Sequence, residues 1–159
     1  ASGTGNMKFM INGALTIGTL DGANVEMREA VGDDNIFIFG LTAREVDNLW
    51  AHGYNATAYY NNNVQLQKVI DALKVGFNGT SFENLANYLL TASPVADPYM
   101  CFADFGAYRE MQAKISGVYQ DKQKWAEMSI VNIASSGRFS ADRAIKEYAD
   151  NIWHLKPTR

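Results

Sequence analysis

The chain has 159 residues, of which 47% are hydrophobic and 19% charged, and its formal net charge is −3. This length suits one domain or a large part of one, and the apolar content excludes intrinsic disorder because burial can offset the ordering entropy. The slight acidity gives no general attraction to nucleic acid, and no apolar run approaches the ~20 residues of a membrane span. The single cysteine, Cys101, excludes a disulfide framework and fits a reducing compartment. We therefore expect a cytoplasmic protein that binds neither nucleic acid nor membrane.

The first half of the chain alternates strand-like and helix-like segments. Residues 15–19 and 35–40 are short, rich in β-branched or aromatic residues and bounded by turn residues, which indicates two strands. A helix is predicted between them over residues 23–30. Thr42 and Glu45 have the spacing of a capping box, which predicts a further helix that closes at Gly53. This alternation favours an α/β fold with short parallel strands, and two strands alone do not make a stable domain.

After Gly53 the sequence is typical of helices. Their predicted ranges are 64–73, 82–90, 108–119, 125–133 and 141–153. Pro94 and Pro98 interrupt regular structure, so we divide the chain into an α/β part over residues 1–92 and a helical part over residues 99–159. In the last helix Ile145, Tyr148 and Ile152 share one face, and this stripe predicts how the helix docks.

Most of the reactive side chains give weak functional signals. Cys101 lies between Met100 and Phe102, so we expect it to act as a small core residue. His52 and His154 lie at or near predicted helix ends, where an exposed capping role is commoner than catalysis. No spacing of metal ligands occurs, so no metal site is predicted.

The segment from Ser2 to Lys8, Ser-Gly-Thr-Gly-Asn-Met-Lys, carries the most chemical information. Gly3 and Gly5 let the backbone approach a ligand, and the amides at the start of a helix can hold a phosphate. Thr4 and Lys8 are four residues apart and would share one helix face. Both a P-loop and a dinucleotide fingerprint are excluded by the spacing, because Lys8 stands three residues after Gly5. From residue types alone, an ordinary capped helix or a flexible chain end is the commoner explanation.

Alternative interpretations of the whole chain belong to other functional classes. One is a non-catalytic α/β module that binds phosphate or nucleotide through the loop at Gly3–Gly5. Another is a helical interaction module over residues 104–153. The turn at Thr19–Asn24 follows the first predicted strand, and ligands gather at the carboxyl ends of parallel strands, so this turn is a secondary candidate site. A plain turn with Asp or Asn capping is the commoner explanation of such a segment.

Residues Ser2–Phe9 strongly resemble the pyridoxal-phosphate attachment segment of the α-glucan phosphorylases, which include the glycogen, starch and maltodextrin phosphorylases. The resemblance continues through Asn12–Met27. It then recurs along nearly the whole chain, at residues 38–40, 53–55, 59–60, 102–104, 132–140 and 152–153.

This resemblance implies a fold and a set of site residues. The chain would be a C-terminal piece of a two-domain glycosyltransferase of the GT-B type, taken from its second, Rossmann-like domain, with the N-terminal domain missing. The absence of an initiator methionine at Ala1 agrees with that expectation. By similarity, Lys8 forms a Schiff base with pyridoxal phosphate, and the amides near Thr4 and Gly5 receive the cofactor phosphate. Ser2 and Gly3 would face the glucosyl group of the substrate.

The implied reaction is the phosphorolysis of terminal α-1,4-linked glucose in glycogen or maltodextrin. Inorganic phosphate would release glucose 1-phosphate with retention, and the cofactor phosphate rather than the imine would shuttle the proton. The full-length enzyme is expected to be a homodimer. The family's basic residues that grip the substrate phosphate, and its catalytic-pocket histidine, are not in this chain. We therefore expect these 159 residues alone to be inactive.

Overall fold

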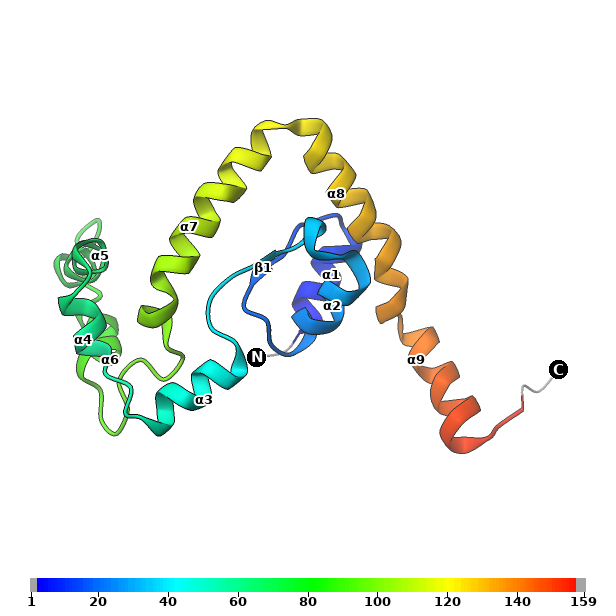
Figure 1. The fold of residues 1–159 in the computed structure, drawn as a ribbon, viewed down its shortest axis with the longest axis horizontal. Helices are drawn as coiled ribbons and strands as arrows, with labels where there is room; N and C mark the ends of the chain where they lie inside the picture. Colours follow the sequence, from blue (N-terminus) through cyan, green and yellow to red (C-terminus); the bar gives the residue numbers. More distant parts are fainter. Residues whose placement is uncertain (1–2, 157–159) are drawn as a thin grey trace. The chain divides into compact units, whose positions relative to one another are not determined.

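Helices predominate in residues 3–156, the part of the chain that the computed structural model describes (Figure 1). These residues form two compact units. The first runs up to Ile38 and resumes at Lys114, and the second covers Phe39–Ala113. The unit boundaries fall at other positions than residues 93–98, where the prolines suggested a break. Mostly helical structure with one small parallel sheet is compatible with the predicted α/β class.

The first unit contains both strands of the described chain, and they pair in parallel as predicted. Ile17 lies opposite Phe37, and Gly18 lies opposite Ile38, so each strand is shorter than the sequence suggested. The elements of this unit are α1 (Thr4–Ile11), β1 (Ile17–Gly18), α2 (Ala23–Val31), η1 (Asp33–Asn35), β2 (Phe37–Ile38), α8 (Lys122–Ser135), η2 (Ser136–Phe139), α9 (Ala141–Tyr148) and η3 (Ala149–Trp153).

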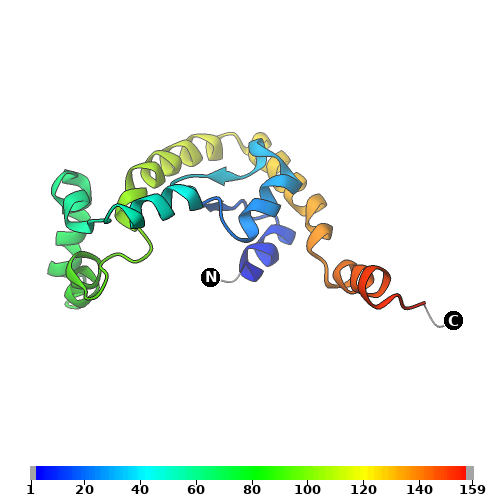
Figure 2. The ribbon, with the colours of Figure 1, turned by 60° about the horizontal axis from the view of Figure 1, so that its bottom comes forward.

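The core of the first unit joins residues from both ends of the sequence. α1, α2 and α8 contact one another, and Figure 2 shows α1 and α2 in blue beside α8 in yellow and orange. The buried members of this core are Met10, Met27, Val31 and Ile36, against which Ile38, Val131 and Phe139 pack. In addition, Asn132 on α8 donates from Nδ2 to the carbonyl oxygen of Asn35 at 2.8 Å. α8 therefore closes the unit over the segment that leads into β2.

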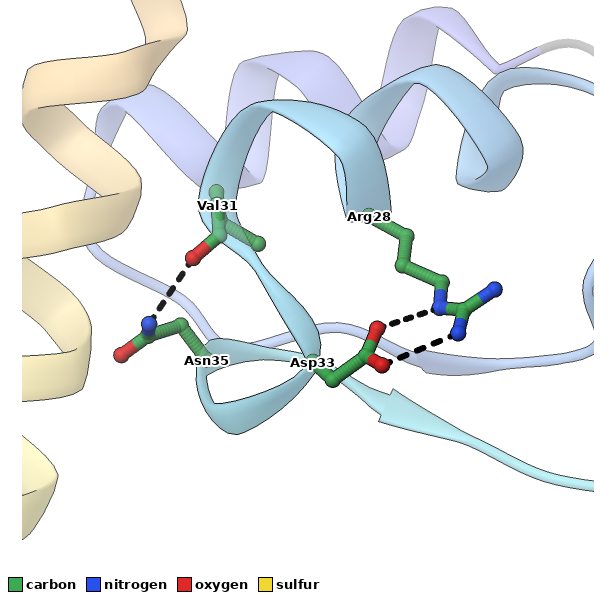
Figure 3. A network of polar contacts seen from close by, with 4 residues as sticks. All are labelled: Arg28, Val31, Asp33 and Asn35. Atoms are coloured by element: carbon green, nitrogen blue, oxygen red, sulfur yellow. Dashed lines mark hydrogen bonds and ion pairs between the residues drawn. The ribbon is translucent and has the colours of Figure 1, made fainter.

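A short polar turn connects α2 to β2 (Figure 3). Arg28 holds Asp33 through two hydrogen bonds, Nε to Oδ1 at 2.5 Å and Nη2 to Oδ2 at 3.0 Å. This pairing lowers the pKa of the Asp33 carboxyl, mainly through the hydrogen bond from Arg28. Asn35 donates from Nδ2 to the carbonyl oxygen of Val31 at 2.8 Å, which satisfies an acceptor at the end of α2. These bonds fix the chain reversal that brings β2 alongside β1.

The second unit is a helical cluster that contains α3 (Ala43–Ala51), α4 (Ala56–Asn61), α5 (Val64–Val75), α6 (Glu83–Thr91) and the first part of α7 (Cys101–Gln120). Figure 1 shows α4, α5 and α6, all in green, as one cluster. The core of the unit consists of Ala56, Leu66, Ile70, Ala86, Leu90 and Phe102. The predicted capping box is confirmed, since Thr42 accepts from the backbone of Glu45 while the Glu45 side chain accepts from the backbone of Thr42.

One prediction about side-chain burial differs from the structure. Cys101 is exposed, not a core residue, because it is the first residue of α7 and only its neighbours Met100 and Phe102 are buried. The stripe on the last helix is exposed, with Ile145 57% and Ile152 61% exposed, so the described residues do not include a surface on which it docks. Both views show α9 and η3, in orange and red, leading away from α1 and α2.

Among residues 3–156, no helix combines the length and the apolar character that crossing a membrane requires.

Candidate functional site

The glycine-rich segment of the sequence forms the start of α1. Gly3 is the residue before the helix, Thr4 and Gly5 lie in its first turn, and Lys8 follows one turn later. The Lys8 side chain is exposed, and no carboxylate in the described part of the chain forms an ion pair with it. Ser2, which the resemblance assigns to the glucosyl group, lies outside the described residues. The structure thus places an accessible primary amine one turn from the helix start.

The first turn of α1 is suited to an anion. No acidic side chain lies in this turn, and Gly3 supplies no side chain to cap it. A Cβ atom built on Gly5 would meet nothing within 4 Å, so a ligand can approach the backbone there. The N-terminus of an α-helix carries partial positive charge and directs its N–H groups outward, which favours a phosphate. The backbone of Gly5 is ordinary helix, so its conformation does not require glycine. Gly5 therefore contributes the open space that its missing side chain leaves.

The start of α1 lies directly against the turn between β1 and α2. A Cβ atom on Gly3 would lie 2.2 Å from the Cβ of Ala23, so only glycine fits at that position. Asn6 donates from Nδ2 to Oδ1 of Asn24 at 2.9 Å, and Asn24 donates from Nδ2 to the carbonyl oxygen of Thr19 at 2.9 Å. The two candidate segments of the sequence, residues 3–8 and 19–24, are thus one continuous structure.

Sequence reasoning identified these two segments separately and missed the residues that join them. In the sequence, Asn24 is recognisable only as a member of its turn, and Asn6 only as part of the motif. Their contact spans 18 residues and has no local spacing signature. The only available signal was that each segment carries an asparagine, a side chain that both donates and accepts hydrogen bonds.

The two histidines behave as predicted. His52 Nδ1 lies 2.7 Å from the carbonyl oxygen of Asn48, and His154 Nδ1 lies 3.0 Å from the carbonyl oxygen of Asp150. Both are exposed, and each contacts a carbonyl four residues before it, as helix-capping side chains do. Nor do three or more histidine, cysteine or carboxylate side chains gather in residues 3–156 as a group able to hold a metal ion.

An open pocket of about 380 Å³ lies in the second unit, and no residue of the sequence motif lines it. Its lining includes small residues, two asparagines and two aromatic residues, but no carboxylate, histidine or lysine: Ala58, Tyr59, Asn62, Asn63, Phe102, Ala103 and Gly106. Its only titratable side chain is that of Tyr59, so it lacks the paired acid and base groups of a catalytic centre. The start of α1 remains the better candidate site.

Comparisons with known proteins identify the family of the chain. A family model described as carbohydrate phosphorylase matches residues 1–155. The glycogen phosphorylase of Synechocystis sp. (strain ATCC 27184 / PCC 6803 / Kazusa) is 52% identical over 157 residues, which cover 99% of this chain and 18% of that protein. The muscle form of glycogen phosphorylase from Homo sapiens is 48% identical, and the glycogen phosphorylase of Pasteurella multocida (strain Pm70) is 47% identical. Each of these two matches covers all of this chain and 19% of the relative.

The chain therefore spans about a fifth of the length of these relatives. Within that stretch the identity is near one half and covers both compact units, including the whole α1 segment. A match of this extent is specific, because the family model covers all but the last four residues. The chain belongs to the carbohydrate phosphorylase family.

Proposed function

We propose that this chain is the part of a glycogen phosphorylase that holds pyridoxal phosphate on Lys8. The enzyme would release terminal α-1,4-linked glucose from glycogen or maltodextrin with inorganic phosphate, giving glucose 1-phosphate with retention. The observation that carries the proposal is the exposed Lys8 amine, one turn after the open backbone at Gly5, in a chain of this family. Residues 1–159 would then form the later part of the second, Rossmann-like domain of a GT-B enzyme.

The residues at the start of α1 fit this cofactor. Its phosphate needs N–H donors without nearby negative charge, and the first turn of α1 contains no acidic residue. Its aldehyde needs a primary amine, which Lys8 presents on the exposed side of the same helix. The backbone amides near Thr4 and Gly5 would hold the phosphate, while Ser2 and Gly3 would face the glucosyl group. When bound, the cofactor supplies a phosphate group able to give and accept a proton.

The remainder of the catalytic apparatus would come from outside this chain. The relatives are about five times as long, so an N-terminal domain can provide the groups that hold inorganic phosphate and the glucan. We infer a cytoplasmic, homodimeric parent enzyme. Catalysis requires reacting groups held together in near-attack geometry, so residues 1–159 alone should not form glucose 1-phosphate. Phosphorolysis by this piece alone would contradict that inference.

Borohydride reduction tests the role of Lys8. The full-length enzyme is incubated with pyridoxal phosphate and reduced, and its peptides are analysed by mass spectrometry. We expect the pyridoxyl group on Lys8, and we expect Lys8→Ala to abolish it. Lys74→Ala is the matched control, because the Lys74 side chain is 37% exposed and its amine is paired with Asp71 at 3.6 Å. A pyridoxyl group on Lys68 or Lys74, with Lys8 unmodified, would refute the assignment. Binding of free phosphate without any lysine adduct would instead favour the non-catalytic module.

A further inference from the structure

We propose that Asn6 and Asn24 are positioning residues for the segment that carries Lys8. The hydrogen bond between their side chains would fix the first turn of α1 against the β1–α2 turn. It would thereby set where the phosphate-binding amides and the Lys8 amine lie. This inference rests on the proposed function of Lys8 and extends it to residues that do not contact the cofactor.

Hydrogen bonds at both ends of its side-chain amide hold Asn24 in place. It is 8% exposed, its Nδ2 donates to the carbonyl oxygen of Thr19, and its Oδ1 accepts from Asn6. The bond to Thr19 determines which end of the amide faces α1. Turning the amide over would present an N–H group to the Asn6 donor and would lose both bonds. Asn24 therefore presents a fixed acceptor to the first turn of α1.

Two glycines provide the space that this contact requires. A Cβ atom on Gly18 would lie 2.5 Å from Nδ2 of Asn24, and one on Gly3 would lie 2.2 Å from the Cβ of Ala23. Real Cβ atoms essentially never approach heavy atoms so closely. At Gly3 and Gly18 the chain thus packs too closely to admit a side chain, and the Asn6–Asn24 pair lies beside this close contact. This geometry links β1, the turn and α1 through one buried amide.

The position of Asn6 within α1 connects this contact to the proposed site. Asn6 lies between Gly5, where the backbone is open to a ligand, and Lys8 two residues later. A rotation of α1 about its axis would move the Lys8 amine and the first-turn amides together, and the Asn6–Asn24 bond opposes that rotation. Preorganised groups bind more tightly because less order has to be gained on binding. The bond should therefore contribute to cofactor affinity and to cofactor orientation.

The test measures cofactor binding in the full-length enzyme after the cofactor has been removed. Asn6→Ala deletes the donor without adding charge, and Asn6→Asp deletes it with nearly the same shape. The matched controls are Asn35→Ala and Asn35→Asp. Asn35 also donates from Nδ2, to the carbonyl oxygen of Val31 in the same unit, but that bond does not involve α1. Each protein is titrated with pyridoxal phosphate and reduced, and the labelled Lys8 peptide is quantified. The circular dichroism of the cofactor band at saturation reports its orientation.

We expect both Asn6 variants to raise the pyridoxal phosphate concentration for half-maximal labelling about tenfold, the effect of losing one hydrogen bond. The circular dichroism band per bound cofactor should also change. The Asn35 variants should match the wild type in both measurements, and thermal unfolding of the cofactor-free proteins checks that every variant is folded.

Three results would overturn the positioning role while leaving the function of Lys8 intact. These are no shift in either Asn6 variant, a shift equal to that of the Asn35 variants, and a shift in Asn6→Asp alone, which would indicate charge repulsion. A wild-type enzyme that is not labelled at Lys8 would overturn the proposed function, and the positioning role with it.

Discussion

Tyr54 donates a hydrogen bond from its hydroxyl group to Oδ2 of Asp97, 43 residues later in the chain, at 2.7 Å. Asp97 is fully buried, and its carboxylate also accepts from the backbone N–H groups of Cys101 and Phe102 at the start of α7. Burial, followed by the hydrogen bond to Asp97, raises the pKa of Tyr54, so its hydroxyl stays a donor at neutral pH. One carboxylate therefore caps α7 and ties it to the segment after α3.

Removing the Asp97 carboxylate should destabilise the protein strongly. Asp97→Ala leaves one buried and two partly buried donors without their acceptor, which should cost about 2–5 kcal/mol of unfolding free energy. Tyr54→Phe removes one donor and should cost about 1–2 kcal/mol. Urea unfolding measures both. Tyr59→Phe is the control, because its ring packs on Tyr54 at 5.3 Å between centroids while its hydroxyl takes no part in the Asp97 network. A Tyr59→Phe effect as large as that of Tyr54→Phe would contradict this account.

Gly40 should tolerate a side chain less well than Gly53. Both have positive φ, +77° and +85°, so an alanine at either position should cost about 1–2 kcal/mol of backbone strain. At Gly53 the added Cβ meets nothing within 4 Å, whereas at Gly40 it would lie 2.6 Å from Oδ1 of Asp104. That oxygen accepts from the backbone N–H of Leu41 at 2.7 Å. We therefore expect Gly40→Ala to lower the unfolding free energy more than Gly53→Ala, and equal losses would show that Asp104 moves aside freely.

Asp104 should make the stability depend on pH. Burial raises its pKa most, the negative charges of Asp97 and Glu45 raise it further, and the hydrogen bond from Leu41 only partly opposes them. The folded protein therefore binds this proton more tightly than the unfolded chain, whose aspartate pKa is about 3.9. The contribution of Asp104 to the unfolding free energy falls as pH rises from about 3.9 through the pKa of Asp104 in the folded protein, and it is constant above that pKa.

Replacing Asp104 by asparagine should remove this dependence. We expect the unfolding free energy of Asp104→Asn to fall less steeply than that of the wild type as pH rises from about 4 through this interval. Chemical unfolding at a series of pH values measures the slope. Asp47→Asn removes an exposed carboxylate on α3 and should leave the slope unchanged. Parallel slopes for wild type and Asp104→Asn would rule out Asp104 as the cause.

The exposed stripe of the last helix predicts a difference between two kinds of substitution. Ile145 and Ile152 are largely exposed within this chain, and we expect the N-terminal part of the full-length enzyme to cover them. Truncating a covered isoleucine costs about 2–5 kcal/mol, so Ile145→Ala and Ile152→Ala should lower the melting temperature of the full-length enzyme. Lys146→Ala should change it little, because Lys146 forms only an exposed ion pair with Asp150. Equal melting temperatures for all three variants would mean that the helix is uncovered there too.

Features of the fold with short sequence signals were predictable. Thr42 and Glu45 are three residues apart, and their capping box begins α3 as expected. The parallel pairing of β1 and β2 followed from two β-rich runs separated by a helix. The start of α7 was not predictable in this way, because the capping carboxylate of Asp97 lies four residues before Cys101 with its backbone in a left-handed conformation. The predicted helix over residues 108–119 therefore began too late.

Within the candidate site, residue types located Lys8 and the two glycines, and the family resemblance gave them their roles. The partners of this segment were not visible in the sequence. Asn24 contacts Asn6 only because β1 and α2 fold back against α1, and the closeness of Gly3 to Ala23 exists only in three dimensions. Such contacts depend on the packing of separate elements, and local patterns do not encode it.

The discontinuity of the first unit has a consequence for how the protein is made on the ribosome. Its core brings Met10 and Met27 together with Val131 and Phe139, and the hydrogen bond from Asn132 to Asn35 spans 97 residues. At a synthesis rate of roughly 5–20 residues per second, this interval lasts roughly 5–20 s. During it the two methionines, fully buried in the finished protein, remain without Val131 and Phe139, the part of their cover that is made last. The second unit, complete once Ala113 has emerged, can reach its final fold first.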